Sequence, residues 1–85
     1  MQIKVVGLPC TKTSRTYINA RAAASEFSQR LHVRWVNDVH EIAEMGSLSS
    51  PAVIVNEKLK QSGRIPSVHE IKLWIQKELT HDEIT

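Results

Sequence analysis

The chain has 85 residues, of which 41% are hydrophobic and 24% charged, and its formal net charge is +2. This length leaves room for one domain, and this composition excludes a disordered polar chain. The basic residues are interspersed with acidic ones and the apolar runs are short, so we expect neither a nucleic-acid-binding face nor a membrane-spanning helix.

The first third of the chain predicts a strand, a long helix and a second strand. Residues 2–6 are rich in β-branched residues, and Gly7 and Pro9 end that strand. The second strand is expected over 32–36. Thr11, Thr13 and Ser14 are alternative N-cap residues for the helix between them. Its apolar face recurs at three- and four-residue steps and comprises Tyr17, Ala20, Ala24, Phe27 and Leu31.

The middle of the chain predicts a short helix followed by two strands. The helix begins after Asn37 or Asp38 and continues to Met45, and Gly46 ends it. Residues 52–55 form a compact apolar run typical of a buried strand. A tight turn at 56–57 then leads into an edge strand over 58–62, for which we expect Leu59 to face inward and the lysines outward.

A capping box begins the last helix. Ser67 and Glu70 have the spacing of that motif. The expected buried stripe of this helix comprises Val68, Ile71, Ile75 and Leu79, with Trp74 beside it. We expect a single domain over 1–79 and a frayed tail over 80–85.

The resulting order is strand–helix–strand–helix–strand–strand–helix. Because a helix joins the first two strands, they should run parallel with a right-handed crossover, whereas the last two form a hairpin. The sequence therefore predicts an α/β fold with a four-stranded mixed sheet flanked by three helices.

Cys10 is the candidate reactive residue, because it falls between the first strand and the first long helix. Free N–H groups and the dipole at a helix N-terminus favour a thiolate, so we expect a lowered Cys10 pKa. Lys12 and Arg15 are close enough in sequence to add positive charge, and Thr13 lies one turn on, where its hydroxyl can donate to the sulfur. The alternative is a small buried cysteine without chemistry, but the flanking residues are typical of a loop.

The order of elements, the cysteine after Val-Gly-Leu-Pro, and Ser-Ser-Pro-Ala-Val-Ile-Val-Asn together resemble the thioredoxin superfamily. More narrowly, the chain is similar to the small glutaredoxin-like "redox-active disulfide protein" family. The stretch 62–67 and the helix after it share this resemblance, which covers residues 1 to about 79.

The resemblance implies roles for four residues. Cys10 matches the nucleophilic first cysteine of a Cys-x-x-Cys motif, and Thr13 stands where the second, resolving cysteine would be. Pro51 matches a cis-proline that borders the active site, and Ser50 would present its backbone to a bound peptide or thiol. The chain departs from the family at Thr13, which makes ordinary dithiol disulfide reduction doubtful.

Three functions remain open from the sequence. In the first, Cys10 acts as a monothiol oxidoreductase in thiol–disulfide exchange, with glutathione as a candidate co-substrate and Lys12 beside the thiol. In the second, the groove between Cys10 and Pro51 binds a partner without turnover. In the third, the least favoured, Cys10 ligates a metal across a dimer.

The remaining expectations concern ligands and surroundings. The four histidines are not spaced as metal ligands, so we expect no metal site and no resident cofactor. The expected partner is a protein or small-molecule thiol or disulfide, and the expected state is a monomer or weak dimer. Without a leader sequence or a disulfide framework, the cytoplasm is the expected compartment.

Overall fold

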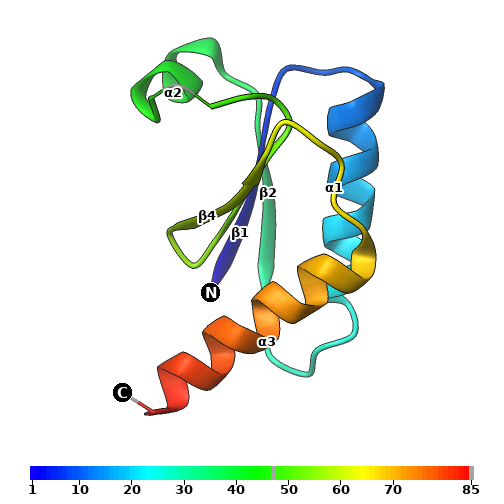
Figure 1. Cartoon of the computed structure of the whole chain (residues 1–85), viewed down its shortest axis with the longest axis vertical. Coiled ribbons are helices and arrows are strands. Elements are labelled where there is room, and N and C mark those ends of the chain that lie inside the picture. The colour runs from blue at the N-terminus through cyan, green and yellow to red at the C-terminus, as the bar shows by residue number, and fades with distance from the viewer. Residues whose placement is uncertain (47, 85) are drawn as a thin grey trace.

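The computed structural model describes the backbone of residues 1–46 and 48–84, and the side chains of that range as far as Thr80. Seven elements follow one another along the chain (Figure 1). The strands are β1 (Gln2–Val6), β2 (His32–Val36), β3 (Ala52–Val55) and β4 (Lys58–Ser62), and the helices are α1 (Thr11–Ala24), α2 (Val39–Glu44) and α3 (Val68–Ile84). In the described residues, no helix is both long and apolar enough to cross a membrane.

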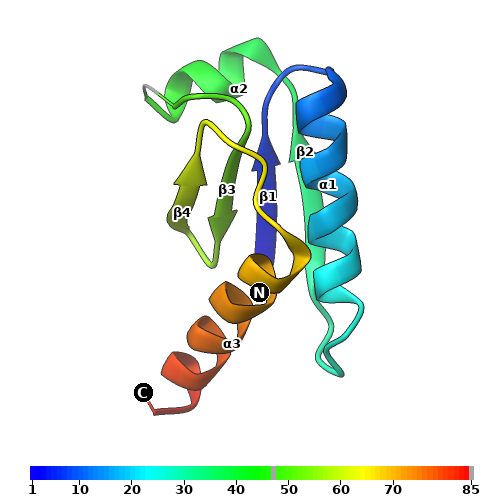
Figure 2. The same cartoon turned by 45° about the vertical axis from the view of Figure 1, so that its right-hand side comes forward.

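The four strands form one mixed sheet in the order β2-β1-β3-β4 (Figure 2). β1 pairs with β2 in parallel and with β3 antiparallel, and β3 and β4 form an antiparallel hairpin. The predicted α/β class, the mixed sheet and the three helices are therefore confirmed. The two central strands are the most buried, as expected for strands covered on both faces.

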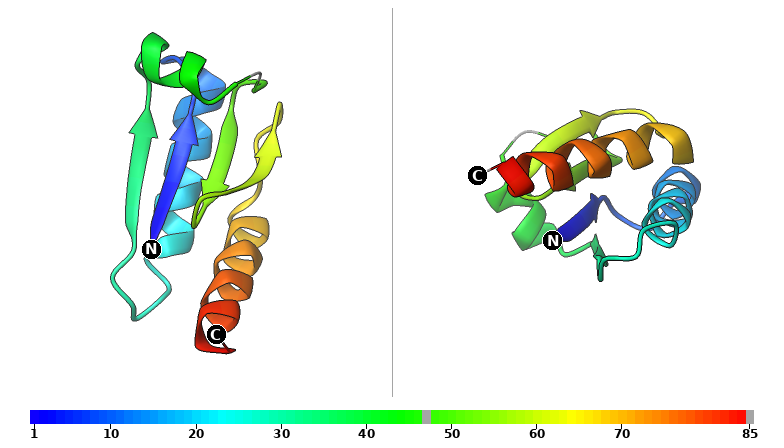
Figure 3. Two further views of the ribbon diagram at one scale, coloured as in Figure 1. Left: turned by 90° about the vertical axis from the view of Figure 1, so that its left-hand side faces the viewer. Right: turned by 90° about the horizontal axis from the view of Figure 1, so that it is seen from below.

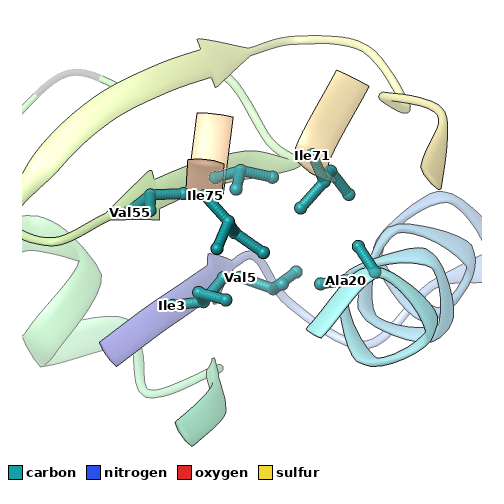
Figure 4. Packing of buried hydrophobic residues seen from close by; sticks show 8 residues of the cluster. Ile3, Val5, Ala20, Val55, Ile71 and Ile75 are labelled. Atoms are coloured by element: carbon teal, nitrogen blue, oxygen red, sulfur yellow. The ribbon is translucent and has the colours of Figure 1, made fainter. Parts of the chain in front are cut away.

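Helices α1 and α3 pack together on one face of the sheet, and α2 lies across the end of the other (Figure 3). Successive residues of β1 serve the two faces, because side chains alternate along a strand. Val5 belongs to the larger core with Ala20, Ile71 and Ile75 (Figure 4). Val6 belongs to a smaller core beneath α2. The β1–α1 loop and the segment before β3 meet at the end of the sheet near α2 (Figure 1).

The start of each helix tests the predicted caps. Ser67 and Glu70 form the predicted capping box, with reciprocal backbone contacts of 3.1 Å at the start of α3. Asp38 caps α2 by accepting from the His40 N–H at 3.0 Å. The three candidates for α1 were wrong, because the N-cap residue is Cys10 and Thr11 is already helical.

The ends of the long helices differ from the predicted patterns. α1 ends at Ala24, so Phe27 and Leu31 reach the core from the following loop instead of from the helix. The turn closes because the Ser25 N–H and hydroxyl bond the carbonyls of Arg21 and Ala22, at 3.0 and 2.7 Å. α3 continues to Ile84, through the segment in which we expected a frayed tail. The side chains of 81–85 lie outside the described residues, so fraying stays a prediction.

The β3–β4 hairpin reverses the orientation that we expected for its second strand. Leu59 is 50% exposed, whereas Lys60 points toward α3 and bonds the buried Glu78 at 2.7 Å. The cause is the two-residue turn, which pairs Val55 with Lys58 and Ile54 with Leu59. Val55 faces the larger core, so Leu59 falls on the opposite face, beyond the cover of α2.

Candidate functional site

Cys10 lies at the N-terminus of α1, in the loop that leaves β1. Its thiol is free and exposed, its backbone is extended with φ −163°, and its carbonyl accepts the Ser14 N–H at 2.9 Å. The first N–H groups of α1 therefore lie around the cysteine without partners from the preceding turn, and they favour negative charge there. The predicted position of the thiol, in a loop at a helix N-terminus, is the observed one.

Thr13 is the direct partner of the cysteine. Its Oγ1 lies 3.3 Å from the Cys10 Sγ, and its side chain is fully buried. This contact is the main reason that the pKa of the Cys10 thiol is lowered, and the Thr13 and Lys12 backbone N–H groups and the Lys12 charge lower it further. Partial desolvation opposes them without prevailing. The thiolate is thus stabilised by hydrogen bonds more than by neighbouring charge.

Gly7 brings a third segment to this pair. A Cβ at Gly7 would lie 2.8 Å from the Thr13 Oγ1 and 2.3 Å from the Ser50 Oγ, closer than real Cβ contacts allow. The end of β1 therefore needs glycine here, because Thr13 of α1 and Ser50 before β3 both close on it. From the sequence, Gly7 is only the residue that ends a strand.

Ser50 and Pro51 complete the arrangement. The Ser50–Pro51 peptide bond is cis, Pro51 is buried, and its carbonyl accepts the Gly63 N–H at 2.9 Å. Ser50 itself is exposed, and its backbone N–H and carbonyl make no hydrogen bond within the described residues. These two polar groups are available to a bound chain beside the Cys10–Thr13 pair.

Lys12 and Arg15, the two cations named from the sequence, both lie exposed on the first turns of α1. Only Lys12 contributes to the lowered Cys10 pKa, and its charge is the smallest of the contributions. No group of three or more His, Cys, Asp or Glu residues within the described range is arranged to hold a metal ion.

The comparisons with known proteins agree with this geometry. A family model described as "Thioredoxin domain" matches residues 1–76. The chain belongs to the thioredoxin domain family. It is 37% identical over 70 residues to a protein named "Thioredoxin" from Methanocaldococcus jannaschii, an alignment that covers 82% of this chain and 80% of the relative. It is 31% identical over 72 residues to another "Thioredoxin", from Methanothermobacter thermautotrophicus, covering 85% and 94%. No solved structure gives a significant match.

Membership of the thioredoxin family confirms the broader resemblance stated from the sequence. The narrower resemblance to the small glutaredoxin-like proteins, and the matching of Thr13 to a resolving cysteine, stay predictions. The predicted roles of the five site residues also stay predictions; these residues are Cys10, Lys12, Thr13, Ser50 and Pro51. In the structure, Thr13 contacts Cys10, and both Thr13 and Ser50 lie against Gly7.

Two aromatic residues support this thioredoxin-fold site in a way that sequence reasoning missed. The Trp35 Nε1–H donates to the Gly7 carbonyl at 2.8 Å, and the Trp35 ring packs on Tyr17 with centroids 5.4 Å apart. The sequence indicates only packing for both residues. The indole bond fixes the Gly7 peptide on which Thr13 and Ser50 converge. An indole at the end of a strand gives no sequence signal for which carbonyl it will reach.

Proposed function

We propose that this domain carries out thiol–disulfide exchange through Cys10 as a single nucleophilic thiol. The observation that supports this most directly is the exposed Cys10 sulfur with its lowered pKa, 3.3 Å from the Thr13 hydroxyl. A thiolate is the attacking species in such exchange, and two relatives that cover most of this chain are named thioredoxins.

The exchange takes two steps. The Cys10 thiolate attacks one sulfur of a disulfide, so that a new S–S bond forms at Cys10 while the old bond breaks and its second sulfur leaves as a thiolate. An external thiolate then attacks the mixed disulfide at its non-protein sulfur. Cys10 leaves as a thiolate, which completes the cycle without net oxidation of the protein.

The external thiol is needed because Cys10 is the only cysteine in the chain. Thr13 occupies the position one helical turn on and offers a hydroxyl, which stabilises a thiolate but cannot resolve a disulfide. Glutathione is our candidate for the resolving thiol, since it is a small, exposed thiol that needs no second protein cysteine. The Lys12 charge, next to Cys10, suits an anionic thiol of that kind.

The Ser50–Pro51 segment would hold the disulfide-bearing partner. The backbone N–H and carbonyl of Ser50, which have no partner among the described residues, can pair with an extended chain or with the peptide groups of a small thiol, as an exposed strand edge does. Attack then occurs beside Thr13, because Ser50 and Thr13 meet across Gly7.

The first test is the pH dependence of Cys10 alkylation in the folded protein, with Cys10→Ser as the blank. We expect the rate to reach its plateau below the pH at which a free cysteine does, because the pKa is lowered. The second test is turnover of a glutathione mixed disulfide with excess glutathione. Turnover that Cys10→Ser abolishes would support the proposal, and an unreactive folded thiol would refute it.

A binding role without turnover is the second candidate, and the absence of a resolving cysteine favours it. In that case the Cys10 thiol and the Ser50 backbone would hold a partner chain across the surface between Cys10 and Pro51. One experiment distinguishes the two functions. A mixed disulfide at Cys10 that glutathione does not cleave indicates binding, whereas cleavage followed by repeated turnover indicates exchange.

A further inference from the structure

An open pocket of about 600 Å³ lies at the opposite end of α1 from Cys10. The second half of α1, the loop after it and the start of β2 enclose it; this loop is the lower, cyan turn in Figure 1. Its volume is within the range of small-molecule sites in proteins. Nothing in the proposed thiol chemistry uses it, since α1 spans about 21 Å between the two ends at 1.5 Å per residue. We refer to it as the Arg21–Arg30 pocket.

The charge of this pocket is one-sided. Arg21, Arg30 and His32 line it, and no acidic side chain of the described residues does. Neither arginine forms an ion pair with a described residue, whereas Arg34 and Arg64 are each bound by both oxygens of a glutamate. The lining is therefore a cationic surface whose charge no acidic side chain among the described residues compensates.

The acidic side chain of the adjoining loop and the carbonyls at the end of α1 already have hydrogen-bond partners. Glu26, in the adjoining loop, is bound by Lys72 at 3.0 Å, outside the pocket lining. The carbonyls at the end of α1 accept hydrogen bonds from Ser25 and Glu26, which reduces the partial negative charge of that helix end. An anion entering the pocket thus meets the arginines with little opposing charge from the part of the chain that the structure describes.

The other side of the pocket is apolar and partly rigid. Leu31 and Val33 are half-buried and line it together with the Tyr17 ring. That ring is held by Trp35, with centroids 5.4 Å apart, and the Arg21 guanidinium lies 5.9 Å from its centroid. The aromatic contact orients Arg21, because a cation above a ring face is attracted to it.

We propose that the Arg21–Arg30 pocket binds a small organic anion, with its phosphate or carboxylate between the two guanidinium groups and its apolar body against Leu31 and Val33. Guanidinium groups bind both of these anions through paired N–H donors. The proposal does not depend on the thiol chemistry proposed above.

The test uses simple probes and two-dimensional ¹⁵N NMR of the full chain. Phenyl phosphate and benzoate carry both halves of the expected ligand, inorganic phosphate carries only the charge, and phenol carries only the ring. We expect saturable shifts confined to about residues 17–33, with a dissociation constant of about 1 mM or lower, and weaker binding at higher salt. Tryptophan fluorescence of a Trp74→Phe variant gives a second readout, since the remaining Trp35 ring contacts the Tyr17 wall.

Matched variants decide the outcome. Arg21→Gln/Arg30→Gln should weaken binding of the better organic anion at least about tenfold, whereas Arg15→Gln, an exposed arginine of α1 outside the pocket, should leave it unchanged. Preference for phenyl phosphate or for benzoate would identify the anionic group. The proposal is wrong if the chemical shifts do not saturate with either phenyl phosphate or benzoate. It is also wrong if the Arg21→Gln/Arg30→Gln variant binds the organic anion as tightly as the parent protein does, or if inorganic phosphate binds as tightly as the two organic anions.

Discussion

At the scale of single residues, Thr13 links the buried packing around Gly7 to the exposed thiol of Cys10. Its methyl and hydroxyl are fully buried against Gly7, yet the hydroxyl lies 3.3 Å from an exposed sulfur. A buried donor is held in one rotamer by its surroundings, so it offers the Cys10 thiolate a hydrogen bond without first being ordered. The acidity of Cys10 should therefore depend on this one hydroxyl more than on the surface charge at Lys12.

Replacing Thr13 with valine tests this dependence, because valine keeps the shape of threonine and removes the hydroxyl. We expect the Cys10 pKa to rise, so that alkylation at pH 7 slows several-fold while its plateau rate at high pH is unchanged. Stopped-flow alkylation over a range of pH measures both quantities. Lys12→Ala is the matched control, and an equal or larger effect of Lys12→Ala would contradict the dominance of the Thr13 hydroxyl over the Lys12 charge.

Gly7→Ala should disturb the same site from the other side. The added Cβ would overlap the Ser50 Oγ at 2.3 Å and the Thr13 Oγ1 at 2.8 Å, so one of these groups must move. We expect a loss of about 1–3 kcal/mol in the free energy of unfolding, as for other overpacked positions, together with slower Cys10 alkylation. Adding Ser50→Ala removes the closer contact and should recover part of the stability, which urea unfolding measures.

At the scale of elements, α3 is attached to the sheet by two different kinds of contact. Its first half contributes Ile71 and Ile75 to the larger core. Its second half contributes Glu78, which is 2% exposed and binds Lys60 at 2.7 Å and Lys58 at 3.2 Å. The Lys60 hydrogen bond leads the contacts that lower the pKa of Glu78 to about 2. The β3–β4 hairpin is thus joined to α3 through an ionic network as well as through the apolar stripe.

Glu78→Gln should loosen that junction while keeping the shape of the side chain. The amide cannot neutralise the two lysines, of which Lys60 is the more enclosed, so the hairpin is left with uncompensated charge. We expect the variant to have a lower urea midpoint than the parent protein. We also expect its amide hydrogen exchange to accelerate more in β4 than in β1. Lys58→Ala, at the exposed end of the network, is the control and should change both quantities less.

At the scale of the whole molecule, acid should unfold the protein partly through its glutamates. The pKa of Glu78 and that of Glu70, the latter lowered chiefly by Arg64, are both about 2 in the fold, against about 4.3 in an unfolded chain. Folded pKa values below the unfolded ones mean that this stabilisation is complete above about pH 5 and is lost as the pH falls toward 2. Urea midpoints between pH 7 and 2 should show this, with a shallower fall for Glu78→Gln.

We expect the single exposed thiol to determine whether two molecules become covalently linked. The described chain has a radius of gyration of 12.2 Å, close to the 12 Å or so expected of a compact domain of this length. Because Cys10 has no internal partner, oxidation should give covalent dimers that reducing agents dissociate and Cys10→Ser prevents. Non-reducing electrophoresis and size-exclusion chromatography measure this. Dimers that persist in the Cys10→Ser variant would show a separate, non-covalent interface.

Much of this fold follows from local sequence rules. The strands and the α3 capping box depend on residues close together in the chain, and the parallel crossover follows from a general rule for strands joined by a helix; the structure has all of them. The Cys10–Thr13 contact could also be predicted from the sequence, since residues three apart share one face of a helical turn. The expected N-caps of α1 failed because the cap geometry is set by how the loop enters the helix.

The parts that escaped prediction depend on contacts between distant segments. The contacts of Gly7 with Trp35 and Ser50 form only after β1, β2 and β3 are assembled. No local sequence pattern predicts which carbonyl an indole N–H will bond. Glu78 was overlooked, although its place three residues after Ile75 continues the buried stripe of α3. A glutamate in that register, facing a strand with two lysines, is a signal that sequence reasoning can use.

The orientation of β4 limits how the number of residues in the β3–β4 hairpin can change. Which face Leu59 takes is fixed by counting residues from the two-residue turn, and Lys60 is the extra residue of a β-bulge that opposes the step from Val53 to Ile54. Losing one residue between Asn56 and Leu59 would exchange the faces, placing leucine against Glu78 and the lysines in solvent. The hairpin should therefore accept many changes of residue type but few single-residue insertions or deletions.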